Sequence, residues 1–172
     1  MRTADRRLGM GRSITRRDLL QGVAAGSFSA MAGVSAGRAD DLQAQLAANR
    51  SEFYRALPSG PFYGFNRPGV EPSEAIIENW WRQGMMGGAK AGYDGIVAFS
   101  QTDFTEDLKK ITIPVLVIHS EDDQIVPYVA AGPKSAKLLR NGTLKTYQDF
   151  PHGMPTTQAD TINADLLEFI RT

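Results

Sequence analysis

The apolar positions of residues 41–101 recur with helical spacing. Over residues 41–57 three leucines and a phenylalanine stand among polar side chains at helical intervals, which predicts one amphipathic helix. A Pro-Ser-Gly-Pro stretch at residues 58–61 ends this helix, and an aromatic loop follows. A second helix is expected to have Pro72 in its first turn and to end near residues 87–88, where two glycines stand. A short third helix is expected over residues 93–99.

The pattern changes at residue 111, where an almost continuous apolar run begins. Residues 111–118 are typical of a parallel strand that is covered on both faces. Residues 133–140 then predict a short helix, and residues 143–147 predict a second strand. The last helix is expected to begin at a capping box formed by a threonine and an aspartate, Thr157 and Asp160. Its inward face comprises Ile162, Leu166, Phe169 and Ile170.

The two predicted strands suggest where chemistry would take place. Loops at the carboxyl ends of parallel strands carry function, and Asp122, Asp123 and His152 stand in such loops. The 29 residues between Asp123 and His152 correspond to one crossover, so the carboxylate can lie beside the imidazole. A carboxylate in this position fixes the tautomer of a catalytic histidine. In the alternative interpretation the aspartates only cap a turn and His152 binds backbone. His119 is expected to be a structural histidine.

Composition narrows the classes of function. The 172 residues contain no cysteine, which excludes disulfides, thiolate zinc sites and a cysteine nucleophile. Only two histidines are present, which excludes a multi-histidine metal site. No run of about eighteen strongly apolar residues occurs, so no membrane span is expected.

The zero net charge hides an asymmetry between the two ends of the chain. Residues 1–39 carry seven arginines and two aspartates, a net charge of +5, and the remaining residues carry −5. A mildly apolar stretch follows the arginines and leads to the small residues around Arg38, the layout of a signal peptide. Arg16 and Arg17, followed by two leucines, resemble a twin-arginine export signal.

We therefore expect residues 1–39 to be a signal peptide that directs the protein to the periplasm or the cell exterior. A disordered basic tail is the alternative. Nucleic acid is not an expected partner, because no aromatic residues alternate with the arginines and the rest of the chain is acidic.

Residues 33–37 match the Gly-x-Ser-x-Gly pattern of a nucleophile elbow, with Ser35 as the serine. An elbow needs a buried, β-branched strand before it and a helix after it, so that the serine oxygen is held at a strained turn. The residues before Ser35 are instead rich in alanine, glycine and serine, and those after it lie at the expected cleavage point. Ser35 is therefore disfavoured as a nucleophile, and no other serine has the context of an elbow.

Several segments together resemble the cofactor-free (non-heme) haloperoxidases, which belong to the α/β-hydrolase superfamily and overlap with arylesterases and perhydrolases. The resemblance runs from about residue 47 to residue 172. It rests on residues 59–69 (SGPFYGFNRPG), 80–86 (WWRQGMM), 103–111 (DFTEDLKKI), 114–119 (PVLVIH), 122–127 (DDQIVP), 151–153 (PHG) and 163–167 (NADLL).

The resemblance implies a Ser-Asp-His triad in which Asp123 and His152 are the aspartate and the histidine. Asp122 is expected to point to solvent or to cap the turn. The implied chemistry is acyl transfer without metal or cofactor, from a small-molecule acyl substrate to water or to hydrogen peroxide. An α/β fold is implied, a partial α/β-hydrolase with a helical cap over residues 40–101 and the last two parallel strands with their helices over residues 102–172. The cap would wall an apolar substrate pocket lined by Phe62, Phe65, Trp80, Trp81 and Met85.

The chain also departs from the family. The amino-terminal half of the family, with its first strands, its oxyanion segment and its elbow serine, has no recognisable counterpart here. We therefore expect a truncated chain that does not hydrolyse esters by itself and that associates through an unpaired strand edge. The alternative function is that of a non-catalytic remnant or a small-molecule binding module.

Overall fold

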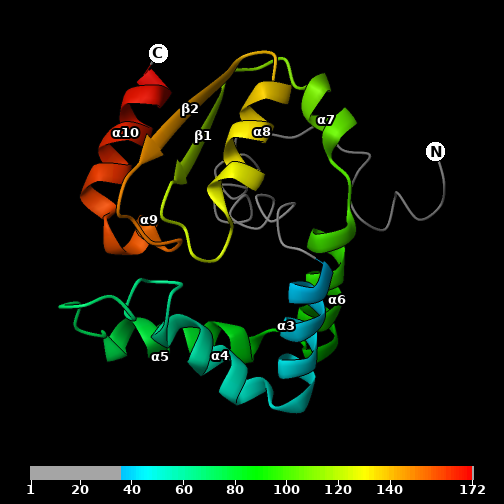
Figure 1. The fold of residues 1–172 in the computed structure, drawn as a ribbon, viewed down its shortest axis with the longest axis vertical. Coiled ribbons are helices and arrows are strands. Elements are labelled where there is room, and N and C mark those ends of the chain that lie inside the picture. The colour runs from blue at the N-terminus through cyan, green and yellow to red at the C-terminus, as the bar shows by residue number, and fades with distance from the viewer. Residues whose placement is uncertain (1–35, 172) are drawn as a thin grey trace.

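The computed structural model describes residues 36–171, and Figure 1 shows their arrangement. The predicted signal peptide lies outside this range except for its last four residues, and so does Ser35. The first region contains the helices α3 (Ala36–Ala48), α4 (Arg50–Ser59), α5 (Glu74–Met86) and α6 (Ala89–Gln101).

The prediction of one helix over residues 41–57 is wrong, because the chain forms two helices that meet at Asn49. The side chain of Asn49 accepts a hydrogen bond from the backbone N–H of Glu52 at 3.1 Å, which caps the start of α4. Helix α5 begins at Glu74 and is capped by the side chain of Ser73, so Pro72 lies before the helix and not in its first turn. Helix α6 is longer than the predicted residues 93–99.

The second region contains the two strands and the helices around them. Its elements are α7 (Thr105–Lys110), β1 (Val115–Ser120), the short 3₁₀ helix η2 (Tyr128–Ala130), α8 (Gly132–Leu138), β2 (Gly142–Tyr147), α9 (Met154–Thr157) and α10 (Ala159–Arg171). Strands β1 and β2 pair in parallel, as predicted, in a register that sets Val115 opposite Gly142 and Ser120 opposite Tyr147. The carboxyl ends of both strands are therefore level, and the two following loops leave the sheet at the same edge. Figure 1 shows α8 and α10 on the two sides of the strand pair.

Several details of this region differ from the prediction, among them the helices α7 and α9, which were not predicted. Strand β1 begins at Val115, four residues later than the apolar run. Thr157 is the last residue of α9 and does not cap α10; its hydroxyl group donates to the side chain of Gln158. Ile162 is buried as expected, but Ile170 is 65% exposed.

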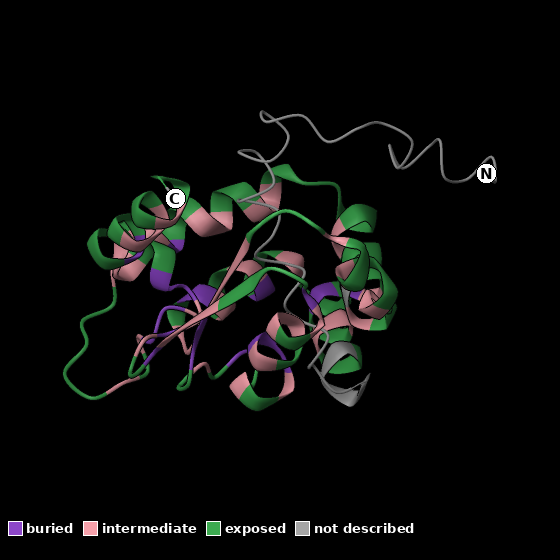
Figure 2. Ribbon diagram, turned by 90° about the horizontal axis from the view of Figure 1, so that it is seen from above, coloured by how far each residue is buried: buried purple, intermediate pink, exposed green. Residues whose placement is uncertain are grey.

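Most of the buried apolar side chains of residues 36–171 belong to three small clusters, and no single continuous core joins them. One cluster joins α3, α4 and α6 through Leu46, Phe53 and Ile96, and another joins β2 to α10 through Tyr147 and Ile162. The third lies in the loop after β1, where Phe62 packs against it from the aromatic loop. Figure 2 shows these buried positions as short purple stretches among helices that are mostly exposed or half-buried.

The sheet has only two strands within the described part of the chain. Each strand therefore has one edge without a strand partner among these residues, and the apolar side chains of β1 are half-buried. Ile113, just before β1, is 52% exposed. Association through the strand edge stays a prediction.

Candidate active site

The loop after β1 holds the Asp123 side chain in one orientation. Its Oδ1 atom accepts hydrogen bonds from the backbone N–H groups of Ile125 and Val126, each at 2.8 Å. An aspartate that binds the backbone two and three residues ahead in this way shapes the turn that carries it. The side chain is only 4% exposed. The other carboxylate oxygen, Oδ2, is turned toward two histidines.

The first of these histidines is His152, in the loop after β2. Its Nδ1 atom lies 2.7 Å from Asp123 Oδ2, so the predicted hydrogen bond between the two side chains is present. The next residue is anchored as well, because the N–H of Gly153 donates to the carbonyl of Phe62 at 2.7 Å. The Phe62 ring meets the His152 ring edge-on, with 4.9 Å between the ring centres.

The second histidine, His119, stands in β1 and is buried. Its Nδ1 atom accepts the N–H of Gly132 at 3.0 Å, so its proton is on Nε2. This Nε2–H lies 3.0 Å from the carbonyl oxygen of Val126 and 3.2 Å from Asp123 Oδ2. Both ring nitrogens are therefore engaged, as expected of a structural histidine. Its contact with Asp123 was not predicted.

These donors control the charge of Asp123. Burial alone would raise the pKa of its carboxyl group, but the hydrogen bonds from His119 and His152, with help from the Val126 N–H, hold that pKa well below its usual range. The carboxylate is thus ionised at all physiological pH values. An ionised, immobile carboxylate beside Nδ1 keeps the proton of His152 on that nitrogen and leaves a lone pair on Nε2.

The Nε2 atom of His152 makes no hydrogen bond to any residue between 36 and 171. No serine hydroxyl in this part of the chain binds His152 either. Ser120, which directly follows His119, is fully buried, and its hydroxyl oxygen accepts the N–H of Asp122 at 3.2 Å. The nucleophile implied by the family resemblance is therefore not found among the described residues.

The predicted cap residues are distributed unevenly around the His152 ring. Phe62 contacts it directly, and Trp80 packs on Phe62 with 5.5 Å between the ring centres. Trp81 donates from its indole nitrogen to Ser51 on α4, at 3.1 Å. Phe65 contacts the ring of Tyr63, and Met85 offers its backbone carbonyl to Arg50. Of the five predicted lining residues, Phe62 contacts the His152 ring itself and Trp80 contacts Phe62, whereas Phe65 is connected to Phe62 only through Tyr63.

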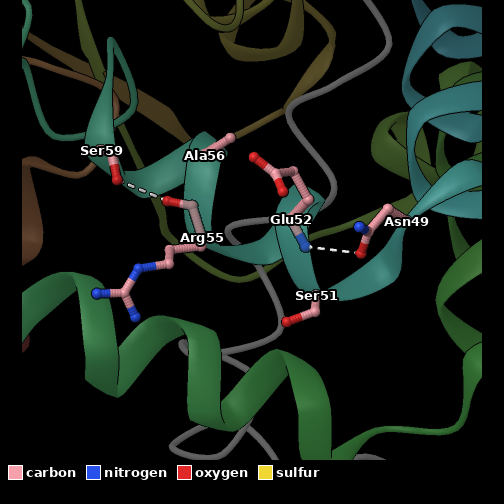
Figure 3. Close-up of a pocket in the computed structure, with 6 residues that line it drawn as sticks. All are labelled: Asn49, Ser51, Glu52, Arg55, Ala56 and Ser59. Carbon is pink, nitrogen blue, oxygen red and sulfur yellow. Dashed lines mark hydrogen bonds between the residues drawn. The ribbon is translucent and has the colours of Figure 1, made fainter.

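The hollows on the described surface include one beside Asp123 and one along α4. An open depression of about 510 Å³ borders Asp123 and is lined by Glu121, Asp123, Pro127, Tyr128 and Val129. A second hollow, drawn in Figure 3, lies along α4 and is lined by Asn49, Ser51, Glu52, Arg55, Ala56 and Ser59. The second shares no residue with the Asp123–His152 pair, and two of its polar groups are already used by the cap of α4 and by the bond from Ser59 to the Arg55 carbonyl.

Asp122 does not simply point to solvent. Its carboxylate pairs with the guanidinium group of Arg67 at 2.7 Å, although it remains half exposed. Arg67 belongs to the aromatic loop and was not recognised as a site residue. Its only sequence signal is an arginine between an asparagine and a Pro-Gly turn, which marks no particular function.

No family model matches the chain. The chain is 69% identical over 133 residues to the bifunctional esterase/perhydrolase of Acinetobacter calcoaceticus, covering 77% of this chain and 48% of that protein. It is 61% identical over 132 residues to a non-heme chloroperoxidase of Burkholderia pyrrocinia, covering 77% and 48%. Among solved structures, a bromoperoxidase from Bacillus anthracis superposes with a TM-score of 0.73 at 28% identity, over 80% of this chain and 49% of that one.

The chain has a partial α/β-hydrolase fold. Its relatives are esterase/perhydrolase and non-heme haloperoxidase α/β-hydrolases, as the sequence resemblance implied. The chain spans about half the length of the curated relatives that it matches. Within residues 36–171, no helix is long and apolar enough to cross a membrane, and no cluster of three or more histidine, aspartate or glutamate side chains is arranged to hold a metal ion.

Proposed function

We propose that this chain provides the general-base half of an acyl-transfer site of the esterase/perhydrolase type. The observation that carries the proposal is the 2.7 Å contact between Asp123 Oδ2 and His152 Nδ1, with Nε2 left unengaged among residues 36–171. A carboxylate that fixes the tautomer of a histidine, with the second nitrogen available, is the arrangement that activates a hydroxyl nucleophile.

In the proposed reaction, Nε2 of His152 removes the proton of a serine hydroxyl as the oxygen attacks the acyl carbonyl. The imidazolium that forms is stabilised by Asp123, which stays ionised because its pKa is low. The same proton then passes to the leaving alcohol. Attack of water on the acyl-enzyme regenerates the serine and gives a carboxylic acid, whereas attack of hydrogen peroxide gives a peracid. Phe62 and Trp80 are the proposed apolar wall beside the acyl group.

The serine is the part that the described residues do not provide. We therefore propose that the chain does not turn over esters at the rate of its relatives when it acts alone. An isolated Asp–His pair has neither a nucleophile to deprotonate nor donors for the oxyanion, and the loss of one such donor already costs about 10²–10³ in rate.

A chimera tests the proposal directly. The matching segment of the Acinetobacter esterase/perhydrolase is replaced by the 133 residues of this chain that align with it, and hydrolysis of p-nitrophenyl acetate and formation of peracetic acid are measured. We expect an active chimera whose kcat falls about 10⁴-fold on Asp123→Asn, because the wrong tautomer of His152 is then favoured.

The matched control is Asp94→Asn, which removes an exposed carboxylate paired with Lys90 on α6. It should leave the activity of the chimera unchanged. A correctly folded but inactive chimera, or one indifferent to Asp123→Asn, would contradict the proposal and favour the binding-module alternative. Ester turnover by the unmodified chain that is lost with Ser35→Ala would show that Ser35 is the nucleophile after all.

We also propose that residues 1–39 direct export by a twin-arginine route. The proposal rests on Arg16 and Arg17 ahead of a weakly apolar stretch. Changing both arginines to lysine keeps the charge but removes the guanidinium pair, so translocation should stop. Fractionation of cells that express the wild type or the double-lysine variant measures this, and normal export of the double-lysine variant would refute the twin-arginine interpretation.

A further inference from the structure

Arg67 joins the two loops that carry Asp123 and His152. Its Nη1 atom donates to the backbone carbonyl of Asp149, in the loop after β2. Its Nη2 atom donates to the backbone carbonyl of Asp122 at 3.2 Å and pairs with the carboxylate of Asp122 at 2.7 Å, in the loop after β1. One guanidinium group thus binds both of the loops that carry the candidate site.

The two carbonyl groups that Arg67 binds belong to residues close in sequence to the candidate catalytic residues. Asp122 directly precedes Asp123, and Asp149 lies three residues before His152. Asp149 also has a positive φ of 59°, a left-handed conformation that costs energy in a residue other than glycine. A hydrogen bond to the Asp149 carbonyl stabilises this turn, and the turn sets the direction in which the chain continues to His152.

We propose that Arg67 is a positioning residue that sets the distance between the Asp123 carboxylate and the His152 imidazole. The assignment rests on the proposed function, since it names a further residue for the same site. Arg67 contacts neither ring nitrogen nor the Asp123 carboxylate, so it acts through the two loops and not on the reacting atoms.

The surroundings of Arg67 support a fixed position. Its side chain is 19% exposed, so its ion pair is shielded from solvent more than an ordinary surface pair. Its backbone belongs to the same aromatic loop, which reaches both site loops at other points as well. The Asn66 amide donates to the Gln124 side chain at 3.0 Å, and Phe62 accepts the N–H of Gly153.

Gly64 shows how closely this loop is held against the His152 loop. It has a φ of +73°, and a Cβ atom added there would lie 3.1 Å from Pro151 and 3.2 Å from the Arg67 guanidinium nitrogen Nε. The loop therefore leaves Arg67 little room to move. A planar guanidinium group can bind two acceptors in different directions at once, whereas a lysine ammonium on its flexible stem cannot span both carbonyls in the same way.

The experiment compares Arg67→Met, Arg67→Lys and Arg55→Met. Arg55 is the matched control because it also pairs with a carboxylate, that of Glu74 at 3.2 Å, but lies exposed on α4. In the full chain, the proton on Nδ1 of His152 gives a downfield imidazole resonance when it is hydrogen-bonded and protected from exchange. With only two histidines in the chain, His152→Gln identifies the signal.

We expect Arg67→Met to remove this resonance, or to broaden it by exchange with water, while circular dichroism shows that the helices remain. Arg67→Lys should weaken the resonance, and Arg55→Met should leave it as in the wild type. In the chimera, Arg67→Met should lower kcat about 10- to 100-fold with KM nearly unchanged, because a displacement of about 1 Å at a catalytic group costs up to about 10²-fold.

A folded Arg67→Met variant with the wild-type resonance would overturn the inference. Unfolding of both Arg67 variants while Arg55→Met folds would overturn it too, since Arg67 would then be needed for folding instead of positioning. A chimera that is inactive before any change at Arg67 would refute the proposed function alone, because the resonance still reports whether Arg67 holds the pair together.

Discussion

The end of β1 and the loop after β2 each place one histidine beside the Asp123 carboxylate. The two histidines differ in whether a ring nitrogen is left without a hydrogen-bond partner among the described residues. His119, on the strand, uses Nδ1 for the N–H of Gly132 and Nε2 for the Val126 carbonyl and for Asp123. His152, in the loop, uses only Nδ1, and its Nε2 has no partner among residues 36–171. A base needs a free nitrogen, so position in the fold decides which histidine can react.

The same comparison applies to the backbone around each residue. His119 is held by the ladder of β1 and by the tight approach of Gly132, where an added Cβ atom would lie 2.5 Å from Nδ1. The loop of His152 is held by residues outside it: the Phe62 ring packs against the His152 ring, and Arg67 binds the carbonyl group of Asp149. The position of His119 is thus set by its own strand and by Gly132, whereas the position of His152 depends on the aromatic loop.

Replacing each histidine by glutamine gives the largest expected contrast. In the chimera, His152→Gln should lower kcat by about 10⁵–10⁶, the loss typical of a catalytic histidine. His119→Gln should cost no more than about 10²-fold, because it disturbs only the support of Asp123. Rates with p-nitrophenyl acetate under saturating conditions measure both. Equal losses in the two variants would contradict the difference in roles.

The same two substitutions should affect the free energy of unfolding in the opposite order, with the larger loss in the His119 variant. His119→Gln leaves at least one buried group without its partner, the Gly132 N–H or the Val126 carbonyl, at a cost of about 1–3 kcal/mol in the free energy of unfolding. His152→Gln should cost less than about 1 kcal/mol, because Asp123 keeps its backbone donors and His119. Urea denaturation of the full chain followed by circular dichroism compares the two. A more stable His119 variant than His152 variant would contradict the prediction.

The sequence predicted the parts of this site that depend on local signals. A continuous apolar run marked β1, and the crossover length between Asp123 and His152 was enough to place both at one edge of a parallel pair. The break at Asn49 was missed because the helical spacing of apolar residues continues across it, although the Asn49-to-Glu52 spacing is itself a capping signal.

Arg67 was missed for a different reason. Its acceptors lie 55 and 82 residues further along the chain, and no periodicity or motif connects positions so far apart. The contact of His119 with Asp123 was missed as well, even though only four residues separate them, because the turn after β1 has to fold before the two side chains meet. Local patterns thus predicted the elements, while the contacts between loops needed the tertiary structure.

At acid pH, Asp123 should contribute less to the free energy of unfolding. The pKa of Asp123 lies below its unfolded value of about 4, so its stabilising contribution is complete above about pH 4 and is lost as the pH falls further toward the folded pKa. The wild type should exceed Asp123→Asn by about 1–3 kcal/mol in free energy of unfolding at pH 7, and the gap should narrow below about pH 4. Asp94→Asn is the control for removing a surface carboxylate. A gap that grows in acid would contradict the assigned direction.

The smallest expected effect concerns the contact between the rings of Phe62 and His152; the ring contact of His119 is with Tyr128 of η2. Phe62→Leu removes the edge-on ring contact, for which the His119 side offers no equivalent from the aromatic loop. Such contacts are worth about 0.5–1.5 kcal/mol, so kcat in the chimera should fall roughly 2- to 10-fold.

The matched variant is Phe65→Leu, which loses a ring contact with Tyr63 but none with His152. It should change kcat less than Phe62→Leu does, and any effect should fall mainly on KM. Because Phe62 also packs on the buried cluster around Val126, the free energy of unfolding has to be measured for both variants. A loss of kcat that merely follows the loss of stability would show that Phe62 supports the loop after β1 as a packing residue and does not orient the His152 ring.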